Sequence, residues 1–345
     1  MKLQERGARN IGATLDFSGV DLFWKMMEEL SSDREPAESQ WASLFETPGY
    51  RVLTEREFTR DFFQRNFRTA YMPSKKAELL VALRRSKERP YLNHYVRVRQ
   101  RKDAIVRYLT GLKASDLSAR AMAAASSYLP QRFRNTVTAA PRTAFLVFKN
   151  DARGHDPIVM DALASMEWGD LSLFLGHEFH HYYRNKLPSS LNFAEAASGE
   201  DCLLNMLVSI ESEGIADLIN MDQTMSKPTA MWKRRKKRYD GLLAEVPDAI
   251  RYLDRWISKT NLSSANWEKA CGELRARIAD SGHEMGNYMA KVALERFGKE
   301  ELVETVGNPF DFIGLYEKAA AGTAQPCFSA RSIRTIRNLG HSLSR

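Results

Sequence analysis

Long apolar runs are missing from this sequence. No stretch approaches the roughly 18 consecutive apolar residues that a membrane-spanning helix needs. The first residues, MKLQERGARNIGATLDF, also lack the apolar core of a secretory signal. These two absences predict a protein without a transmembrane segment, and we expect a cytoplasmic location.

Cysteine is scarce as well. The three cysteines, Cys202, Cys271 and Cys327, are far apart and form no Cys-x-x-Cys pair. An odd number of widely spaced cysteines favours neither a disulfide framework nor a cysteine zinc site. We therefore expect a reducing compartment, in agreement with the cytoplasmic location.

Charge of one sign is in only modest excess. The chain has 51 Lys and Arg against 43 Asp and Glu, a formal net charge of +8 over 345 residues. This excess allows weak attraction to anionic surfaces but does not by itself indicate nucleic-acid binding. Repeats and low-complexity tracts are also missing, so the composition is that of a globular protein with two domains or one large domain.

Helical periodicity dominates what is present. Apolar residues recur at three- and four-residue spacing in residues 20–30, 55–67 and 75–86, and residues 91–109 are a further helix candidate. Two β-rich runs follow, at 143–149 and 157–162, with a turn at 151–156 between them. From Glu167 onward the pattern is helical again.

This order of elements predicts a mostly helical α+β fold and excludes a doubly wound sheet. The character of the sequence changes near Tyr128–Pro130. We therefore predict two domains, a helical N-terminal region at residues 1–127 and a second domain at residues 128–345.

The segment GDLSLFLGHEFHHYYRNKLP, at residues 169–188, carries the clearest chemical motif. In it, His177, Glu178 and His181 match the pattern His-Glu-x-x-His. On a helix, positions four residues apart differ by about 40° of rotation, so both imidazoles leave the same face and can bind one metal ion. Glu178, about 100° away, is suited to act as a general base. His180 is predicted to have a supporting or structural role.

A third metal ligand is expected on a later helix, in SIESEGIADLIN at residues 209–220. Glu211 and Glu213 are about 200° apart on a helix, so only one of them can face the ion. We choose Glu213, because Asp217 then lies on the same face and can orient a ligand histidine. Glu211 is interpreted as a solvated or structural carboxylate.

At these residues the chain resembles the gluzincin metallopeptidases, which pair His-Glu-x-x-His with a later Glu-x-x-x-Asp. More narrowly, HEFHH followed by EGIAD is similar to bacterial families described as zinc-dependent peptidases of unknown function. The resemblance covers most of residues 128–320 and implies a zincin-like fold, a Zn²⁺ cofactor and a peptide or protein substrate. A free edge of the strand at 157–162 is a candidate for aligning that substrate.

The segment GHEMGNYMA, at residues 282–290, supplies the candidate for a further catalytic group. Ser281 and Glu284 form a capping-box signal that predicts a helix start. By resemblance, His283 donates to the developing oxyanion, with Tyr288 as the reserve candidate. Gly286, in the same segment, would allow close packing against another helix.

Two alternatives compete with the peptidase hypothesis. One is a metal-binding protein that is inactive or acts on another substrate. The other is a module for nucleic acid or an anionic membrane surface, based on residues 232–239, where six consecutive basic residues from Lys233 to Arg238 lie between Trp232 and Tyr239. We interpret this basic run as a solvated loop.

Overall fold

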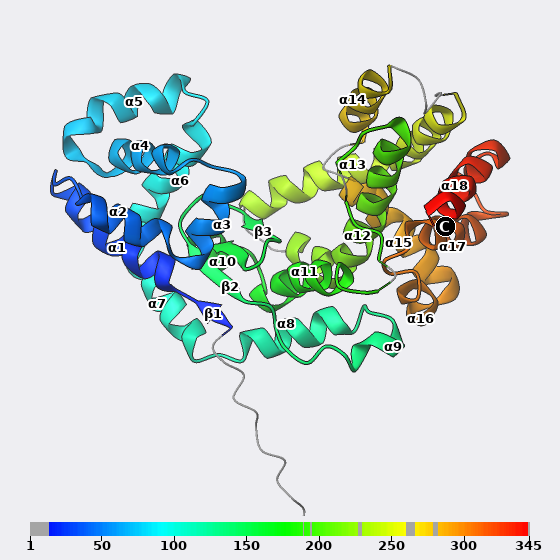
Figure 1. Cartoon of the computed structure of the whole chain (residues 1–345), viewed down its shortest axis with the longest axis horizontal. Helices are drawn as coiled ribbons and strands as arrows, with labels where there is room; N and C mark the ends of the chain where they lie inside the picture. Colours follow the sequence, from blue (N-terminus) through cyan, green and yellow to red (C-terminus); the bar gives the residue numbers. More distant parts are fainter. Residues whose placement is uncertain are drawn as a thin grey trace, which may run out of the picture. The chain divides into compact units, whose positions relative to one another are not determined.

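Helices dominate the structure, a computed structural model. It describes residues 14–343, apart from residues 189, 194, 227–229, 260–265 and 279–281 and the side chains of residues 230 and 231. Short strands in this part of the chain form one four-stranded sheet (Figure 1). The predicted mostly helical α+β class is therefore confirmed.

Contacts between residues divide the chain into two compact units. The first comprises residues 1–119 and 139–171, and the second comprises residues 120–138 and 172–345. Each unit thus contains two separate stretches of chain. These divisions, after residues 119, 138 and 171, differ from the domain boundary expected between residues 127 and 128. That boundary stays a prediction.

The first unit combines the sheet with a group of helices. Its strands are β1 (Leu15–Asp16), β2 (Thr143–Leu146), β3 (Ala152–Arg153) and β4 (Ile158–Asp161). Its helices are α1 (Ser18–Ser31), α2 (Glu38–Phe45), α3 (Pro48–Arg56), α4 (Arg60–Tyr71), the short 3₁₀ turn Pro73–Lys75, α5 (Lys76–Arg85), α6 (Arg89–Gln100), α7 (Lys102–Lys113) and α10 (Ala162–Glu167). Helix α8 (Leu117–Ser126) leads into the second unit.

The sheet has the strand order β1-β2-β4-β3. Strand β2 pairs in parallel with β1 and β4, and β3 pairs antiparallel with β4. The two central strands were predicted, whereas β1 and β3 are two residues long and too short to show a period-two pattern. The prediction of a free strand edge along residues 157–162 is wrong, because β4 pairs with β2 on one side and with β3 on the other.

Two predicted helices are each divided in the structure. The run at 55–67 is interrupted at residues 57–59, where the Thr59 hydroxyl accepts a hydrogen bond from the Phe62 amide and caps α4. The run at 91–109 breaks at Arg101, which has non-helical angles (φ −113°, ψ 12°) between α6 and α7. Neither break contains a glycine or a proline, and the apolar residues keep their helical spacing across both. The sequence pattern therefore predicts one continuous helix at each place.

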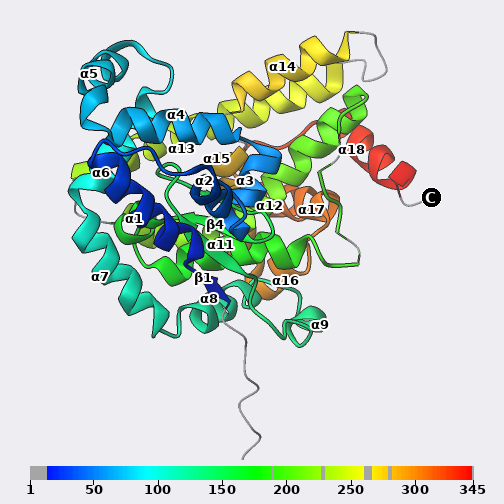
Figure 2. The same ribbon diagram turned by 60° about the vertical axis from the view of Figure 1, so that its left-hand side comes forward.

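Helices α1, α4 and α6 lie close together in the first unit (Figure 2). Aromatic rings fill the core between them. Phe67 makes edge-on ring contacts with Phe23 and Tyr95, at centroid distances of 5.2 and 4.9 Å. The buried Tyr95 hydroxyl donates to the carbonyl of Phe148 at 2.9 Å, just after β2. The helices are thereby tied to the sheet by a hydrogen bond as well as by packing.

The second unit is helical in its described part. It contains α9 (Gln131–Arg134), α11 (Leu171–Arg184), α12 (Gly199–Met225), α13 (Ala230–Lys259), α14 (Trp267–Arg277), α15 (His283–Phe297), α16 (Lys299–Val303), α17 (Pro309–Ala320) and α18 (Ala330–Leu343). Helix α15 begins at His283 with Gly282 as its N-cap, one residue later than the expected cap at Ser281, which lies outside the described residues.

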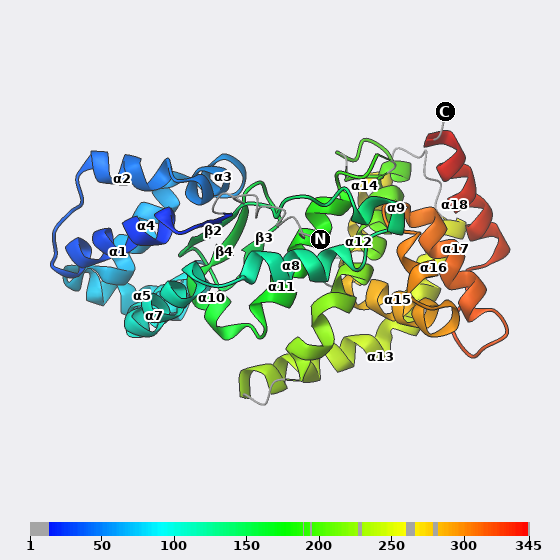
Figure 3. The same cartoon turned by 90° about the horizontal axis from the view of Figure 1, so that it is seen from below.

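Two glycines allow α12 and α15 to cross in close contact (Figure 3). A Cβ atom placed on Gly214 would lie 2.7 Å from the Gly286 Cα, and one placed on Gly286 would lie 2.8 Å from the Gly214 Cα. Neither position therefore accommodates a larger residue without moving a helix backbone. The close packing predicted at Gly286 is confirmed, and it brings the start of α15 beside α12.

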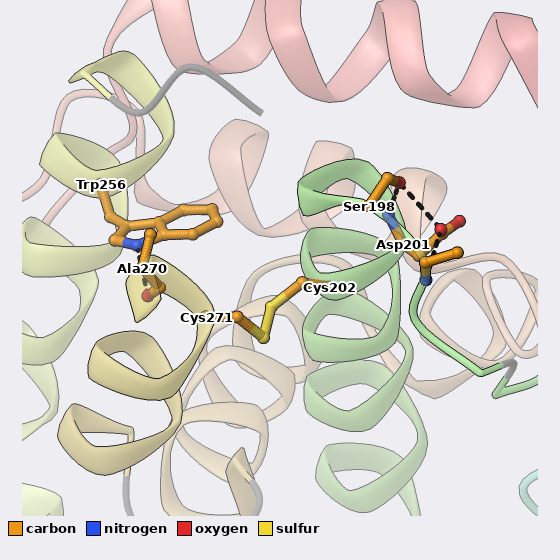
Figure 4. Close-up of a disulfide and its surroundings, with 7 residues drawn as sticks. Ser198, Asp201, Cys202, Trp256, Ala270 and Cys271 are labelled. Carbon is orange, nitrogen blue, oxygen red and sulfur yellow. Dashed lines mark hydrogen bonds between the residues drawn. A yellow bond between two sulfur atoms is a disulfide. The ribbon is translucent and has the colours of Figure 1, made fainter. Parts of the chain in front are cut away.

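A disulfide joins Cys202, near the start of α12, to Cys271 in α14 (Figure 4). Both cysteines are buried, and the Trp256 indole close by donates to the Ala270 carbonyl at 3.0 Å. The expectation of no disulfide was wrong, because the 69-residue separation hides a pair that only the packing of two helices brings together. Disulfides persist mainly in oxidising compartments, which argues against the expected reducing one; the cytoplasmic location stays a prediction.

The disulfide gives a direct prediction about stability. Replacing both Cys202 and Cys271 by Ser should lower the free energy of unfolding by about 4 kcal/mol, because the bond closes a loop of 69 residues in the unfolded chain. Denaturant unfolding of the two proteins measures this loss, with Cys327→Ser as the control that should change little. Titration of the denatured, unreduced protein should find only the Cys327 thiol, and three free thiols would contradict the pairing.

The basic run at Lys233–Arg238 lies within α13, so its interpretation as a loop was wrong. The residues flanking this run, Trp232 and Tyr239, are both buried and anchor the helix. No helix among the described residues is long and apolar enough to cross a membrane.

Candidate metal centre

Helix α11 presents the two histidines of the His-Glu-x-x-His motif. It begins at Leu171 and ends at Arg184. Gly176 lets this helix approach its neighbours, since a Cβ there would lie 2.9 Å from the Ala124 Cβ and 3.2 Å from the Ile219 Cγ2. His177, the next residue, is thereby held against α12.

Helix α12 supplies the acidic side chains. Its N-cap is Ser198, whose hydroxyl accepts a hydrogen bond from the Asp201 amide. The helix then runs without interruption to Met225 and carries Glu213 and Asp217 one turn apart on one face. Asp217 is buried, and the Glu213 side chain is 19% exposed.

Three side chains converge on one point. The Glu213 Oε2 atom lies 3.4 Å from His177 Nε2 and 3.2 Å from His181 Nε2, and the two Nε2 atoms are 3.0 Å apart. Ligands at about 2.0–2.2 Å around a tetrahedral zinc ion are separated from one another by roughly 3.3 Å. Glu213 Oε2 is also buried and accepts no hydrogen bond from the described residues. The three side chains therefore fit a divalent metal ion, and zinc suits this donor set.

The two histidines are oriented by groups on α12. His181 Nδ1 lies 2.8 Å from the Ser212 hydroxyl, and His177 Nδ1 lies 3.5 Å from Asp217 Oδ1. Both contacts leave the Nε2 atoms directed at Glu213. This arrangement matches the common rule that a ligand histidine uses its second nitrogen for a supporting contact.

His283 joins the same cluster from α15. Its Nδ1 atom donates to Asp217 Oδ2 at 3.1 Å, while its Nε2 atom lies 3.4 Å from Glu213 Oε2. Gly282, with a left-handed φ of 87°, precedes it and allows the helix to start at this residue. Asp217 thus holds two imidazoles at once, those of His177 and His283, through its two oxygens.

The electrostatics of the cluster favour positive charge. Burial by itself would lower the pKa of His283, but the hydrogen bond and charge of Asp217, together with Glu213 and Glu284, raise this pKa to about 10. For His177, burial is also outweighed, and Glu213, Asp217 and Glu178 raise the pKa. Burial would raise the pKa of Glu213, yet the histidines hold it well below its usual value. These groups together stabilise a bound cation.

Glu178 lies beside the cluster on α11 and is half-buried. Its carboxylate makes no hydrogen bond or ion pair with another described residue, but its charge contributes to the raised pKa of the neighbouring His177. A carboxylate in this position is available to accept a proton. The general-base role stays a prediction.

Glu211 has a different environment from Glu213. Its side chain and that of Arg184 are fully buried and form an ion pair, in which the Arg184 Nε atom donates to Glu211 Oε2 at 2.9 Å. The other Glu211 oxygen accepts a hydrogen bond from the Gly307 amide at 2.9 Å. Glu211 is therefore a structural carboxylate that joins α11, α12 and the loop before α17.

His180, with its predicted supporting or structural role, and Tyr288, the reserve candidate, lie apart from the metal centre. The His180 ring is fully buried, and its Nε2 atom lies 3.2 Å from the Tyr128 carbonyl oxygen. Burial, followed by the charges of His181 and Arg184, holds the pKa of His180 well below its usual value. The Tyr288 hydroxyl donates to the Gln325 side chain. The structure brings neither residue into the cluster.

Ser212 was missed by the sequence analysis. A serine next to a glutamate has no distinctive spacing, and its contact with His181 depends on how α11 packs against α12. Helical rotation could have indicated it, because Ser212 lies about 100° from Glu213 and can reach a neighbouring helix.

A family comparison agrees with this geometry. Residues 41–325 match the model of the family described as "Putative zinc dependent peptidase (DUF5700)". The chain belongs to this family. The family match confirms the narrower resemblance, to zinc-dependent peptidases of unknown function, and extends it toward the N-terminus beyond residues 128–320. No curated protein and no solved structure matches the chain.

Proposed function

We propose that this member of the family is a zinc-dependent metallopeptidase of the gluzincin type. The observation that carries the proposal is the convergence of His177 Nε2, His181 Nε2 and Glu213 Oε2 within 3.4 Å. Beside them on α11, the Glu178 carboxylate makes no hydrogen bond or ion pair with the described residues. These three residues would hold zinc and leave one coordination position open, as in catalytic zinc sites. Zinc bound there would supply Lewis-acid polarisation and make a water molecule acidic enough to ionise near neutral pH.

The side chains of this chain then have defined tasks. The Glu178 carboxylate accepts a proton from the attacking water and passes it to the leaving amine. His283, fixed through Nδ1 by Asp217, keeps its Nε2–H available to donate to the oxyanion that develops on the peptide carbonyl. Asp217 and Ser212 hold the ligand imidazoles in orientation.

Metal content and peptide hydrolysis test the proposal together. The purified protein should contain about one zinc per chain, and His177→Ala should contain almost none. A mixed peptide library should be cleaved, with activity lost in chelator and restored by zinc. A protein that binds zinc fully but cleaves no peptide would favour the alternative of a metal-binding protein without peptidase activity.

His283→Phe separates oxyanion stabilisation from metal binding. We expect kcat to fall by about 10²–10³-fold, which is the usual effect of removing one oxyanion donor. Phenylalanine retains an aromatic ring at this position but has no group that donates a hydrogen bond. Zinc content should change little, since the three ligands remain. Tyr288→Phe is the matched control and should keep kcat, because its hydroxyl is bound to Gln325. A normal kcat in His283→Phe would remove this residue from the mechanism.

A further inference from the structure

Three cations of the basic run form an exposed face on α13, which we call the basic face: Lys233, Arg234 and Lys237. None of the three pairs with an acidic side chain in the described part of the chain. Lys236 differs, because its ammonium group binds Asp240 at 2.7 Å. The basic face therefore presents three charges that remain available to an external anion.

The aromatic residues beside the basic face are not accessible. Trp232 is 3% exposed and Tyr239 is 8% exposed, and both lie on the opposite side of α13. Binding to single-stranded nucleic acid uses exposed aromatic rings on which bases stack. Interfacial membrane helices likewise insert exposed aromatic or apolar side chains. The buried positions of both rings disfavour these two modes, and leave a purely electrostatic surface.

The basic face and the metal centre both belong to the second unit, and one hydrogen bond connects their helices. The Tyr239 hydroxyl donates to the Asn287 side chain at 3.0 Å, and Asn287 follows His283 by one turn of α15. Lys237 precedes Tyr239 by a rise of about 3 Å, and Asn287 is about 6 Å along its helix from His283. With the side chains and about 10 Å for the width of α13, these steps add up to a path of roughly 25 Å that leads from the basic face around α13 to the cluster.

We propose that the basic face binds an acidic stretch of the polypeptide that the metal centre cleaves. This inference rests on the proposed peptidase function. An extended chain advances about 3.3 Å per residue, so roughly eight residues bridge 25 Å. The preferred substrate thus carries a cluster of Asp or Glu about eight residues from the cleaved bond. Because this charge attraction acts far from the cleaved bond, it strengthens substrate binding and lowers KM, whereas kcat stays unchanged.

The test uses one cleavable peptide core in eight versions, which differ in the composition, spacing and side of an added tail. A tail of six glutamates is placed two or eight residues from the cleaved bond, on either side, and tails of six glutamines serve as neutral counterparts. The variant Lys233→Gln/Arg234→Gln/Lys237→Gln removes the basic face. Its matched control, Arg331→Gln/Arg334→Gln/Arg337→Gln, removes three exposed cations of α18.

We expect KM for the eight-residue spacing to be about tenfold lower with glutamate than with glutamine, since each exposed ion pair contributes a factor of about two to five. The ratio of KM with the glutamine tail to KM with the glutamate tail should fall to about one in the α13 variant, and also in the unmodified protein at 0.5 M salt. In the α18 control this ratio should stay at about ten. A ratio that survives in the α13 variant, or that is equal at both spacings, would overturn the inference.

A binding measurement separates this inference from the proposed function. Fluorescence anisotropy of a labelled hexaglutamate peptide, with Glu178→Gln protein, requires no hydrolysis. Binding that disappears in the α13 variant and not in the α18 control supports the docking surface even if no peptide is cleaved. Equal binding by both variants overturns it, as does tighter binding of a DNA duplex or of anionic vesicles through the same three residues.

Discussion

Glu178→Gln should lower kcat by about 10³-fold or more while leaving one zinc per chain. General acid–base catalysis contributes about 10²–10⁴-fold, and a carboxamide of the same shape cannot accept a proton. The substitution removes no metal ligand, because the three converging atoms belong to His177, His181 and Glu213. It also breaks no hydrogen bond to another described residue. Catalysis and metal binding should therefore separate cleanly.

Three measurements check this prediction. Zinc content and the unfolding midpoint should match the unmodified protein, whereas kcat on a cleaved peptide should not. Glu200→Gln, at an exposed position in the first turn of α12, is the matched control and should behave as the unmodified protein in all three. Native turnover in Glu178→Gln would show that another group accepts the proton, and the mechanism would need a different base.

The local parts of the site were predictable from helical geometry. A spacing of four residues places His177 and His181 on one face wherever the helix packs, and the same rotation separates Glu211 from Glu213. Both conclusions depend only on the backbone of a single helix. The structure agrees, because Glu213 approaches both histidines while Glu211 pairs with Arg184.

The remaining features depend on contacts between distant segments. The disulfide joins residues 69 positions apart, and Asp217 reaches His283 across 66 positions. Neither contact leaves a pattern in a local stretch of sequence. The break at Arg101 also lacks a local signal, and the helices on its two sides pack differently: α6 contacts α4 and α5, whereas α7 contacts α10. Apolar periodicity reports which face of a helix is buried, but not what that face meets.

Glu213→Ala and Glu211→Ala should fail in different ways. Loss of Glu213 removes one of three ligands, so zinc content after dialysis should fall to a small fraction while the protein stays folded. Loss of Glu211 leaves the Arg184 charge fully buried without its partner, which typically costs about 3–5 kcal/mol. The Gly307 amide also loses its acceptor. Metal analysis and denaturant unfolding of both variants distinguish these outcomes, and a reversed order would exchange the two assignments.

A double substitution makes the distinction sharper. Replacing Glu211 by Leu and Arg184 by Met removes both buried charges, and apolar residues of similar volume often restore the stability of such a pair. This double variant should therefore regain most of the stability lost in Glu211→Ala and bind zinc, because it retains His177, His181 and Glu213. No second substitution of that kind can rescue Glu213→Ala, since its defect is a missing ligand. If the double variant folds but contains no zinc, then Glu211 contributes to the metal centre beyond its structural role.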